Sequence, residues 1–384
     1  MIFSRRQSEK RMDISRKKKI IVLLTAAAIL SAGVLGLFLY AQSVPKMPAG
    51  TIFATSFQEG LAAVRINDKW GYIDRTGTLV IPCEFLYAWF FSEGLAGVGK
   101  DDNDKWGFID KTGTLVIPCK FGDPGYFSEG FACVRINVCG EYGFIDKTGK
   151  IIIPCEFDEA SNFSDGLAMV RENGKLGFID RTGKLVIPCE FNEAGPFIEG
   201  LAIVEKHDKW GFIDKTGKIV IPCEFDDAWS FSEGLAVVQK DGKRGFIDKT
   251  GTIVIPFEFD MVFLFSEGLA NVQKDGKWGF IDKTGTIVIP CGFDDARTFS
   301  EGLAMVQKAG KWGFIDKTGT IVIPCEFDEA CDFSEGLTVV YEGKYPGFID
   351  KSGKWVLRPN PTLRQRYNDF KEKVKDWIDS KRKP

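Results

Sequence analysis

The sequence predicts an all-β protein made of nine tandem repeats of about 34 residues, each with three strands. Two phrases recur along the chain, KWGFIDKTG and FSEGLA, each in identical or varied form. The glycine that follows the tryptophan recurs at intervals of 36, 36 and then six times 34 residues, at positions 71, 107, 143, 177, 211, 245, 279, 313 and 347. No stretch inside a repeat keeps a 3.6-residue period long enough for a helix, which favours short strands joined by turns.

The repeat at 231–265 shows how the strands are expected to follow one another. The apolar run GLAVVQK predicts a first strand, and an Asp-Gly turn joins it to a second strand, RGFID, as a hairpin. The aspartate of the next segment, DKTG, is expected to hydrogen-bond the turn that it begins, and the glycine to take a positive φ. TIVIP predicts a third strand that ends at its proline. A variable segment then crosses to the next repeat.

The Trp-Gly pairs of the second strand are expected to be structural, because a glycine there leaves room for another backbone to come close. Five repeats keep both residues: Trp70 and Gly71, Trp106 and Gly107, Trp210 and Gly211, Trp278 and Gly279, and Trp312 and Gly313. In the other four repeats the tryptophan is replaced by Tyr142, Leu176, Arg244 and Pro346. A unit of three strands is too small to bury its apolar face alone, so each repeat is expected to pack against its neighbours.

Two architectures fit such an array, an open superhelical stack and a closed β-propeller. Propellers typically have about four to eight blades of four strands, whereas this chain shows nine repeats with three clear strands each. The first and last repeats begin and end in the same phase, so no strand of one terminus is expected to complete a sheet at the other. We therefore expect the open, solenoid-like array, with the β-propeller as the alternative.

Two flanking segments are expected to be helical. Residues 20–41 are 22 residues without a charge, enough for a transmembrane helix at ~1.5 Å per residue. Residues 360–384 carry apolar side chains at intervals of three and four, as an amphipathic helix does, with Thr362 and Gln365 as its capping box. The expected order is a basic cytoplasmic tail at 1–19, the transmembrane helix at 20–41, a linker at 42–56, the repeats at 57–359, and a helix at 360–384 that caps the last repeat.

The charges around the uncharged run predict its orientation. Eight basic residues precede the run, and Lys46 is the one basic residue between it and Arg65. The positive-inside rule therefore places the N-terminus in the cytoplasm and the repeats outside the cell membrane, in a single-pass protein. The alternative is a signal peptide cleaved near Ala41-Gln42-Ser43, which would release a secreted protein, although the run is longer than such segments usually are.

The sequence offers few candidates for catalysis or cofactor binding. Residues 44–359 carry a net charge of −13, which argues against nucleic acid as a partner. His207 is the one histidine of the chain, and we expect it to be a turn residue. The repeated aspartates of the IDxTG segments are expected to form turns rather than calcium sites, since no cluster supplies the six or more oxygens that calcium takes. We therefore expect no cofactor, no metal and no catalytic residue.

Seven cysteines share one repeat position, directly after Ile-Pro, and the repeat with Phe257 at that position shows that it is apolar. They are Cys83, Cys119, Cys155, Cys189, Cys223, Cys291 and Cys325. Equivalent positions of neighbouring three-stranded units are expected to be about 14 Å apart, too far for a disulfide. We therefore expect core thiols, although unpaired thiols are unusual outside the cytoplasm.

The core pattern KWGFIDKTGxIVIP, followed by FDEA and FSEGLA, resembles the WG repeat, or KWG repeat, of bacterial proteins, and the resemblance covers all nine copies. It implies a repetitive β architecture and an interaction role at the cell envelope, with no established catalytic chemistry. We therefore expect a membrane-anchored, extracytoplasmic scaffold that binds a protein or a cell-wall glycan. Trp89 and Trp229, in the variable crossing segments, are the candidate partner-binding residues. The alternatives are a glycan-acting enzyme with paired carboxylates and a purely structural spacer.

Overall fold

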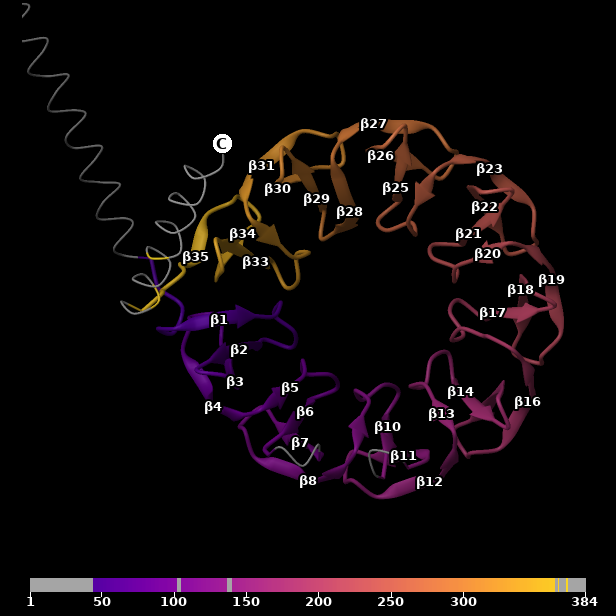
Figure 1. Cartoon of the computed structure of the whole chain (residues 1–384), viewed down its shortest axis with the longest axis horizontal. Helices are drawn as coiled ribbons and strands as arrows, with labels where there is room; N and C mark the ends of the chain where they lie inside the picture. The colour runs from indigo at the N-terminus through magenta and orange to yellow at the C-terminus, as the bar shows by residue number, and fades with distance from the viewer. Residues whose placement is uncertain (1–43, 102–104, 137–139, 363–364, 366–370, 372–384) are drawn as a thin grey trace, which may run out of the picture. The chain divides into compact units, whose positions relative to one another are not determined.

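The computed structural model describes residues 44–101, 105–136, 140–362, 365 and 371. The chain divides into two compact units, 1–45 and 46–384, and the second unit is described here by itself. Its named elements in the described residues are all strands, and they form nine antiparallel sheets. Figure 1 shows these sheets following one another around a closed ring, as the blades of a β-propeller.

The strands of a blade pair in the order in which the chain forms them. The first strands are mostly short: β1 (Thr51–Ala54), β5 (Tyr87–Ala88), β9 (Asp123–Pro124), β13 (Glu159–Ala160), β20 (Asp227–Ala228), β24 (Met261–Val262), β28 (Asp295–Ser300) and β32 (Glu329–Ala330). The second strands hold the apolar run: β2 (Ala62–Ile66), β6 (Leu95–Gly99), β10 (Phe131–Arg135), β14 (Leu167–Glu172), β17 (Leu201–Lys206), β21 (Leu235–Lys240), β25 (Leu269–Lys274), β29 (Leu303–Lys308) and β33 (Leu337–Glu342).

The third strands hold the Trp-Gly pair: β3 (Lys69–Ile73), β7 (Trp106–Asp110), β11 (Tyr142–Asp146), β15 (Lys175–Asp180), β18 (Lys209–Asp214), β22 (Lys243–Asp248), β26 (Lys277–Asp282), β30 (Lys311–Ile315) and β34 (Tyr345–Asp350). The fourth strands, most of which lie along the outer rim in Figure 1, are β4 (Leu79–Phe85), β8 (Leu115–Phe121), β12 (Ile151–Phe157), β16 (Leu185–Phe191), β19 (Ile219–Phe225), β23 (Ile253–Phe259), β27 (Ile287–Phe293), β31 (Ile321–Phe327) and β35 (Trp355–Leu357). In the fifth blade a single bridge, Ala194 with Val204, stands in place of the first strand.

The expected count of three strands per repeat is wrong, because the variable crossing segment contributes a further strand to the blade that follows it. In the sixth blade, β20 pairs with β21 through Asp227 opposite Gln239 and Ala228 opposite Val238. Such a strand is only two residues long, so it leaves no alternating pattern for sequence reasoning to detect. It forms because it pairs with the longer strand that follows it in the chain, as β20 pairs with β21.

The turns form as the sequence predicts. Between β21 and β22, Asp241 and Gly242 have φ values of 52° and 79°, the left-handed pair of a two-residue hairpin. After β22, Asp248 Oδ1 accepts hydrogen bonds from the N–H groups of Thr250 and Thr252 at 2.8 and 3.0 Å. The same aspartate turn recurs in every repeat, at Asp74, Asp110, Asp146, Asp180, Asp214, Asp248, Asp282, Asp316 and Asp350.

The hydrophobic core lies between blades rather than inside them. One cluster joins Phe246 and Ile255 of the sixth blade to Val262, Val272 and Ile281 of the seventh. Clusters of the same kind lie at the successive junctions, so each sheet buries its faces against the sheets before and after it. The expectation that each repeat packs against its neighbours is therefore confirmed.

The expected open array is wrong, because the last blade packs against the first. One core cluster combines Met47 and Phe57 of the first blade with Val339, Phe348 and Leu357 of the ninth. No strand is exchanged: β1 to β4 form one sheet and β32 to β35 another. Equal phase at the two termini therefore does not imply an open array, because side chains alone can join two complete sheets.

The helical part of the expected fold class finds no support in the described residues, whose named elements are all strands. The described residues contain no helix that is long and apolar enough to cross a membrane. The uncharged run at 20–41 lies outside the described residues, as does most of 360–384. Both hydrogen bonds of the expected capping box at 362–365 are present. Thr362 N donates to Gln365 Oε1 at 2.7 Å, and Gln365 N donates to Thr362 Oγ1 at 3.2 Å. Gln365 Nε2 also reaches Gly50 O of the first blade.

Candidate functional site

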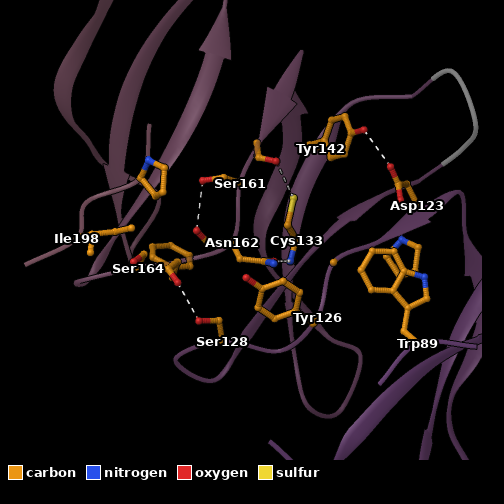
Figure 2. A pocket seen from close by; sticks show the side chains of 15 residues that line it. Trp89, Asp123, Tyr126, Ser128, Cys133, Tyr142, Ser161, Asn162, Ser164 and Ile198 are labelled. Carbon is orange, nitrogen blue, oxygen red and sulfur yellow. Dashed lines mark hydrogen bonds between the residues drawn. The ribbon is translucent and has the colours of Figure 1, made fainter. Parts of the chain in front are cut away.

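A cavity of about 530 Å³ is lined by residues of the second, third, fourth and fifth blades, most of them from the crossing segments. Figure 2 shows its lining, with Trp89 on one side, Asp123 and Tyr142 together on another, and Asn162 beside Cys133. The lining side chains come largely from the variable positions of the repeat, where neighbouring blades carry unrelated residues. This cavity is the candidate functional site.

Asn162 crosses from the fourth blade to the third. Its Oδ1 accepts a hydrogen bond from the N–H of Cys133 at 3.3 Å, which orients the amide and leaves Nδ2 at its other end. Gly125 makes this contact possible, because a Cβ at that position would lie 2.4 Å from Asn162 Oδ1. In the fourth blade the equivalent N–H, of Met169, is instead bound by that blade's own Ser161 Oγ at 3.1 Å. The third blade has no side chain at the position of Ser161, and Asn162 of the fourth blade binds the N–H of Cys133 in its place.

A second polar group forms around Asp123, on β9. The hydroxyl of Tyr142 donates to Asp123 Oδ2 at 3.2 Å, and Arg135 Nη2 lies 3.8 Å from the same oxygen. Arg135 also lies over the Tyr142 ring, at 5.3 Å from its centre. Burial, followed by the negative charge of Asp123, raises the pKa of Tyr142, which keeps its hydroxyl protonated as a donor. Tyr142 stands where most repeats have tryptophan, so this departure from the repeat supplies a polar contact.

Aromatic side chains form the remaining wall and the rim of the site. Trp89, at the candidate position, lines the cavity and is 38% exposed. Its ring centre is 6.2 Å from that of Trp106, which in turn stacks on Tyr87 at 5.4 Å. Phe90 lies 5.6 Å from Tyr126, another lining residue, which is 41% exposed. The second and third blades thus present a group of accessible rings to solvent.

Trp229, the other candidate residue, occupies the equivalent position in the sixth blade but is placed differently. It is half-buried and packs against the core cluster between the sixth and seventh blades. Arg244 lies 5.6 Å above its ring, and the ring of Phe263 is 5.7 Å away. Trp229 does not line the cavity, so the structure does not bring the two candidate tryptophans together.

The Trp-Gly pairs lie in the third strands, opposite a bulge of the fourth strand. In the first blade Trp70 is paired with Phe85 and Tyr72 with Ile81, so Gly71 alone faces three residues. A Cβ at Gly71 would lie 2.5 Å from Ile81 O. Similarly close backbone or side-chain atoms face the glycines at 107, 143, 177, 211, 245, 279, 313 and 347. Among the tryptophans, Trp70, Trp106, Trp210 and Trp312 are half-buried, and Trp278 is buried.

A family model described as "WG containing repeat" matches nine segments of the chain, 53–70, 70–103, 106–137, 142–175, 177–210, 210–243, 245–278, 278–312 and 312–345. The chain belongs to the WG-containing repeat family. The matched segments cover most of the ring, and their boundaries fall near the Trp-Gly position of successive blades. No curated protein matches the sequence of this WG-repeat chain.

The comparison with solved structures finds matches of low similarity. PorZ, a surface component of the type-IX secretion system of Porphyromonas gingivalis, is 10% identical, covers 82% of this chain and 52% of its own, and gives a TM-score of 0.31. The extracellular domain of BT4673 from B. thetaiotaomicron is 12% identical over 79% of this chain and 53% of its own, at 0.34. Virginiamycin B lyase from Staphylococcus aureus is 18% identical over 62% and 93%, at 0.32. The chain spans about half the length of the first two, and similarity at this level says nothing about function.

The other residue types considered in the sequence lie apart from the cavity, with one exception. The seven cysteines of the repeat position are free thiols on the fourth strands and are half-buried rather than fully buried. Cys133, a buried free thiol, does line the cavity, and its Sγ lies 3.5 Å from Ala160 O. His207 is exposed in a hairpin turn with a φ of 55°. Across the described residues, no group of three or more metal-ligating side chains is found.

Sequence reasoning missed Asp123, Gly125, Tyr142 and Asn162 as members of one site. It noted Tyr142 as a departure from the repeat, but it took all copies as equivalent in searching for a functional one. A usable signal was present: the third repeat has Pro124-Gly125 in its crossing segment, and this segment lies within the second of the two 36-residue intervals, 107–143. Several departures in adjacent copies mark the place where the ring loses its regularity.

Proposed function

We propose that this WG-repeat propeller is a binding protein of the cell envelope and that its cavity, lined by the second to fifth blades, binds a cell-wall glycan. The observation that supports this function is the cavity itself, which combines accessible aromatic rings with a small number of polar groups. Concave sites that combine aromatic side chains with a few placed polar groups are typical of small-molecule recognition. A regular propeller without ligand contacts has no need of such departures from its repeat.

Binding is favoured over glycan hydrolysis by the charged groups present. Hydrolysis of the two-carboxylate type needs a pair of acids about 5 to 9.5 Å apart. Among the described residues that line the cavity, Asp123 is the one carboxylate, and its Oδ2 already accepts a bond from Tyr142. The cavity gives the hydrolase alternative no second acid. The spacer alternative leaves the exposed rings of Trp89 and Tyr126 without a purpose.

The location outside the cytoplasmic membrane is part of this proposal. It is supported by the basic residues that precede the uncharged run at 20–41 and by their scarcity after it. Protease added to intact cells is expected to digest the repeats only after the outer layers of the envelope are made permeable, and without lysis of the cytoplasm. Protection of the repeats until the cytoplasmic membrane is broken would contradict this location.

The binding function is tested by replacing the aromatic wall. Full-length protein in detergent is mixed with purified, insoluble cell-wall material, and the bound fraction is measured after sedimentation. Trp89→Ala removes an exposed ring that contributes contact area to a ligand, and we expect at least a tenfold weaker apparent affinity. Trp229→Ala changes the equivalent residue of a blade outside the cavity and serves as the control, with affinity near that of the unmodified chain. Equal binding by the Trp89 variant and the unmodified chain would refute the cavity as the glycan site.

A further inference from the structure

The polar atoms of the cavity indicate which chemical groups a ligand would carry. Asn162 Nδ2 is a donor without a partner among the described residues, since the amide is oriented by the bond from Cys133 N–H to Oδ1. Asp123 Oδ1 is likewise an acceptor without a partner among the described residues, because Tyr142 and Arg135 approach the other oxygen, Oδ2. Both side chains line the cavity, and Figure 2 shows them on either side of Cys133 and Tyr126. One donor and one acceptor therefore remain for a ligand.

We propose, building on the glycan-binding function above, that the cavity recognises an N-acetylated amino sugar through its acetamido group. The carbonyl of that group accepts from Asn162 Nδ2, and its N–H donates to Asp123 Oδ1. The sugar ring lies against the exposed ring of Trp89. An acetamido group needs one donor, one acceptor and an apolar surface for its methyl, and Pro124 and Trp89 offer apolar surface in the cavity lining.

Charge favours a neutral ligand. The repeats carry a net negative charge, and the one charged side chain among the described residues that line the cavity, Asp123, is acidic, which disfavours phosphate or carboxylate groups on a ligand. A plain hexose lacks the amide that would use both polar atoms, so Asn162 Nδ2 and Asp123 Oδ1 would not both be paired on its binding. Both groups are partly exposed to solvent, and a bound ligand would cover them. A polar group that a ligand covers without pairing it weakens binding, and this gives the site its discrimination.

Three tetrasaccharides with the same linkage test the proposal: β-1,4-linked N-acetylglucosamine, glucose and glucosamine. Their affinities for the full-length protein in detergent are measured by isothermal titration calorimetry. We expect the acetylated tetramer to bind at least tenfold more tightly than the glucose tetramer. We expect the affinity of the cationic glucosamine tetramer not to exceed that of the acetylated tetramer. Equal affinity for the acetylated and glucose forms would overturn acetamido recognition while leaving glycan binding intact. Tightest binding by glucosamine would show that charge, rather than the acetamido group, decides.

Two substitutions test whether the Asn162 Nδ2 donor, rather than the general shape of the cavity, determines the preference for the acetylated sugar. Asn162→Asp keeps an oxygen for the N–H of Cys133 and removes the donor, and we expect the preference for the acetylated tetramer to fall to about twofold or less. Gly125→Ala is expected to do the same by displacing the Asn162 side chain, as its Cβ would occupy the space of Oδ1. Ser230→Ala, at the equivalent position of the sixth blade, is the control. An unchanged preference in both test variants would overturn the role of Asn162, and binding of an envelope protein in place of all three glycans would overturn the proposed ligand class.

Discussion

The junction between the ninth and first blades, here called the seam, differs from the other junctions because no continuous chain crosses it. Its side-chain contacts are nonetheless those of an ordinary junction. Between the seventh and eighth blades, Ser266 Oγ donates to Phe299 O at 2.7 Å, and at the seam Ser334 Oγ donates to Phe57 O at 2.7 Å. The repeat therefore carries the contacts that close the ring within its own sequence, and closure needs no exchanged strand.

The seam adds backbone contacts that replace the missing covalent link. Met47 N donates to Arg358 O at 2.8 Å, and Asn360 Nδ2 donates to Met47 O at 3.0 Å. Gly50 N in turn donates to Asn360 O at 3.1 Å. Residues from both ends of the described ring thus hold one another directly. The comparison predicts that damage at the seam opens the ring, whereas equal damage elsewhere only weakens it.

The largest expected difference concerns the buried aliphatic residue of the fourth strand. Leu357 at the seam and Ile289 in the seventh blade hold equivalent positions and are both buried. Replacing either with alanine removes core contacts and leaves a cavity, which costs about 2 to 5 kcal/mol of unfolding free energy. Urea unfolding is expected to show a similar loss for both variants. Sedimentation velocity is expected to show a larger frictional ratio, or concentration-dependent association, for Leu357→Ala alone.

The outcome that would contradict the comparison is equally plain. An Ile289→Ala protein that expands or associates as much as the Leu357→Ala protein would show that the seam is no weaker than a junction crossed by the chain. Loss of stability without a change in shape in both variants would show that the additional contacts of Met47, Gly50 and Asn360 suffice to hold the ring closed.

The nine repeats and their three longest strands could be predicted because they depend on local information. Apolar runs, the Asp-Gly hairpins and the aspartate turns each act within a few residues, and the turn at Asp248 forms as expected. Closure could not be predicted in this way, since it depends on the angle between successive blades added up around the ring. The two-residue strand β20 was equally hidden, because its pairing leaves no periodic pattern.

Acid is expected to weaken the ring through carboxylates at the turns and at the seam. Hydrogen bonds from Thr284 keep the pKa of Asp282 below its usual value, despite some loss of solvation. At the seam, partial burial opposes ionisation of Glu335, but its bonds with Arg75 and Gly60 N–H outweigh burial and lower its pKa. A lowered pKa in the folded state means that the stabilisation is present above the unfolded-state pKa and is lost as the pH falls through the folded-state value.

We therefore expect the thermal midpoint to be nearly constant above about pH 5 and to fall below about pH 4. Glu335→Gln removes one titrating group at the seam, so its stability is expected to be lower at neutral pH and to fall less steeply in acid. Glu172→Gln, on an exposed strand end, is the control. A stability that rises on acidification between about pH 5 and pH 3 would contradict the assignment of these carboxylates as stabilising in their ionised form.

The site was less predictable than the fold for a related reason. Trp89 could be selected because a tryptophan at a variable position is visible in one repeat. Asn162 could not, since its role depends on Gly125 in the preceding blade lacking a side chain, and this relation appears only when the two blades are packed together. Comparing each repeat with its neighbours, rather than with the average repeat, would have identified Asn162 as a candidate.

The smallest expected effect sharpens the comparison most, because it alters one hydrogen bond at each of two matched places. Ser334→Ala at the seam and Ser266→Ala at the ordinary junction each remove a hydroxyl that donates to a phenylalanine carbonyl of the next blade. Each is expected to cost about 0.5 to 1.5 kcal/mol in urea unfolding. Amide hydrogen exchange is expected to separate them: faster exchange at Met47 and Gly50, whose N–H groups bond across the seam, should follow Ser334→Ala and not Ser266→Ala. Equal protection of these two amides in both variants would show that the seam opens no more readily than its neighbours, and that the ring behaves as nine equivalent junctions.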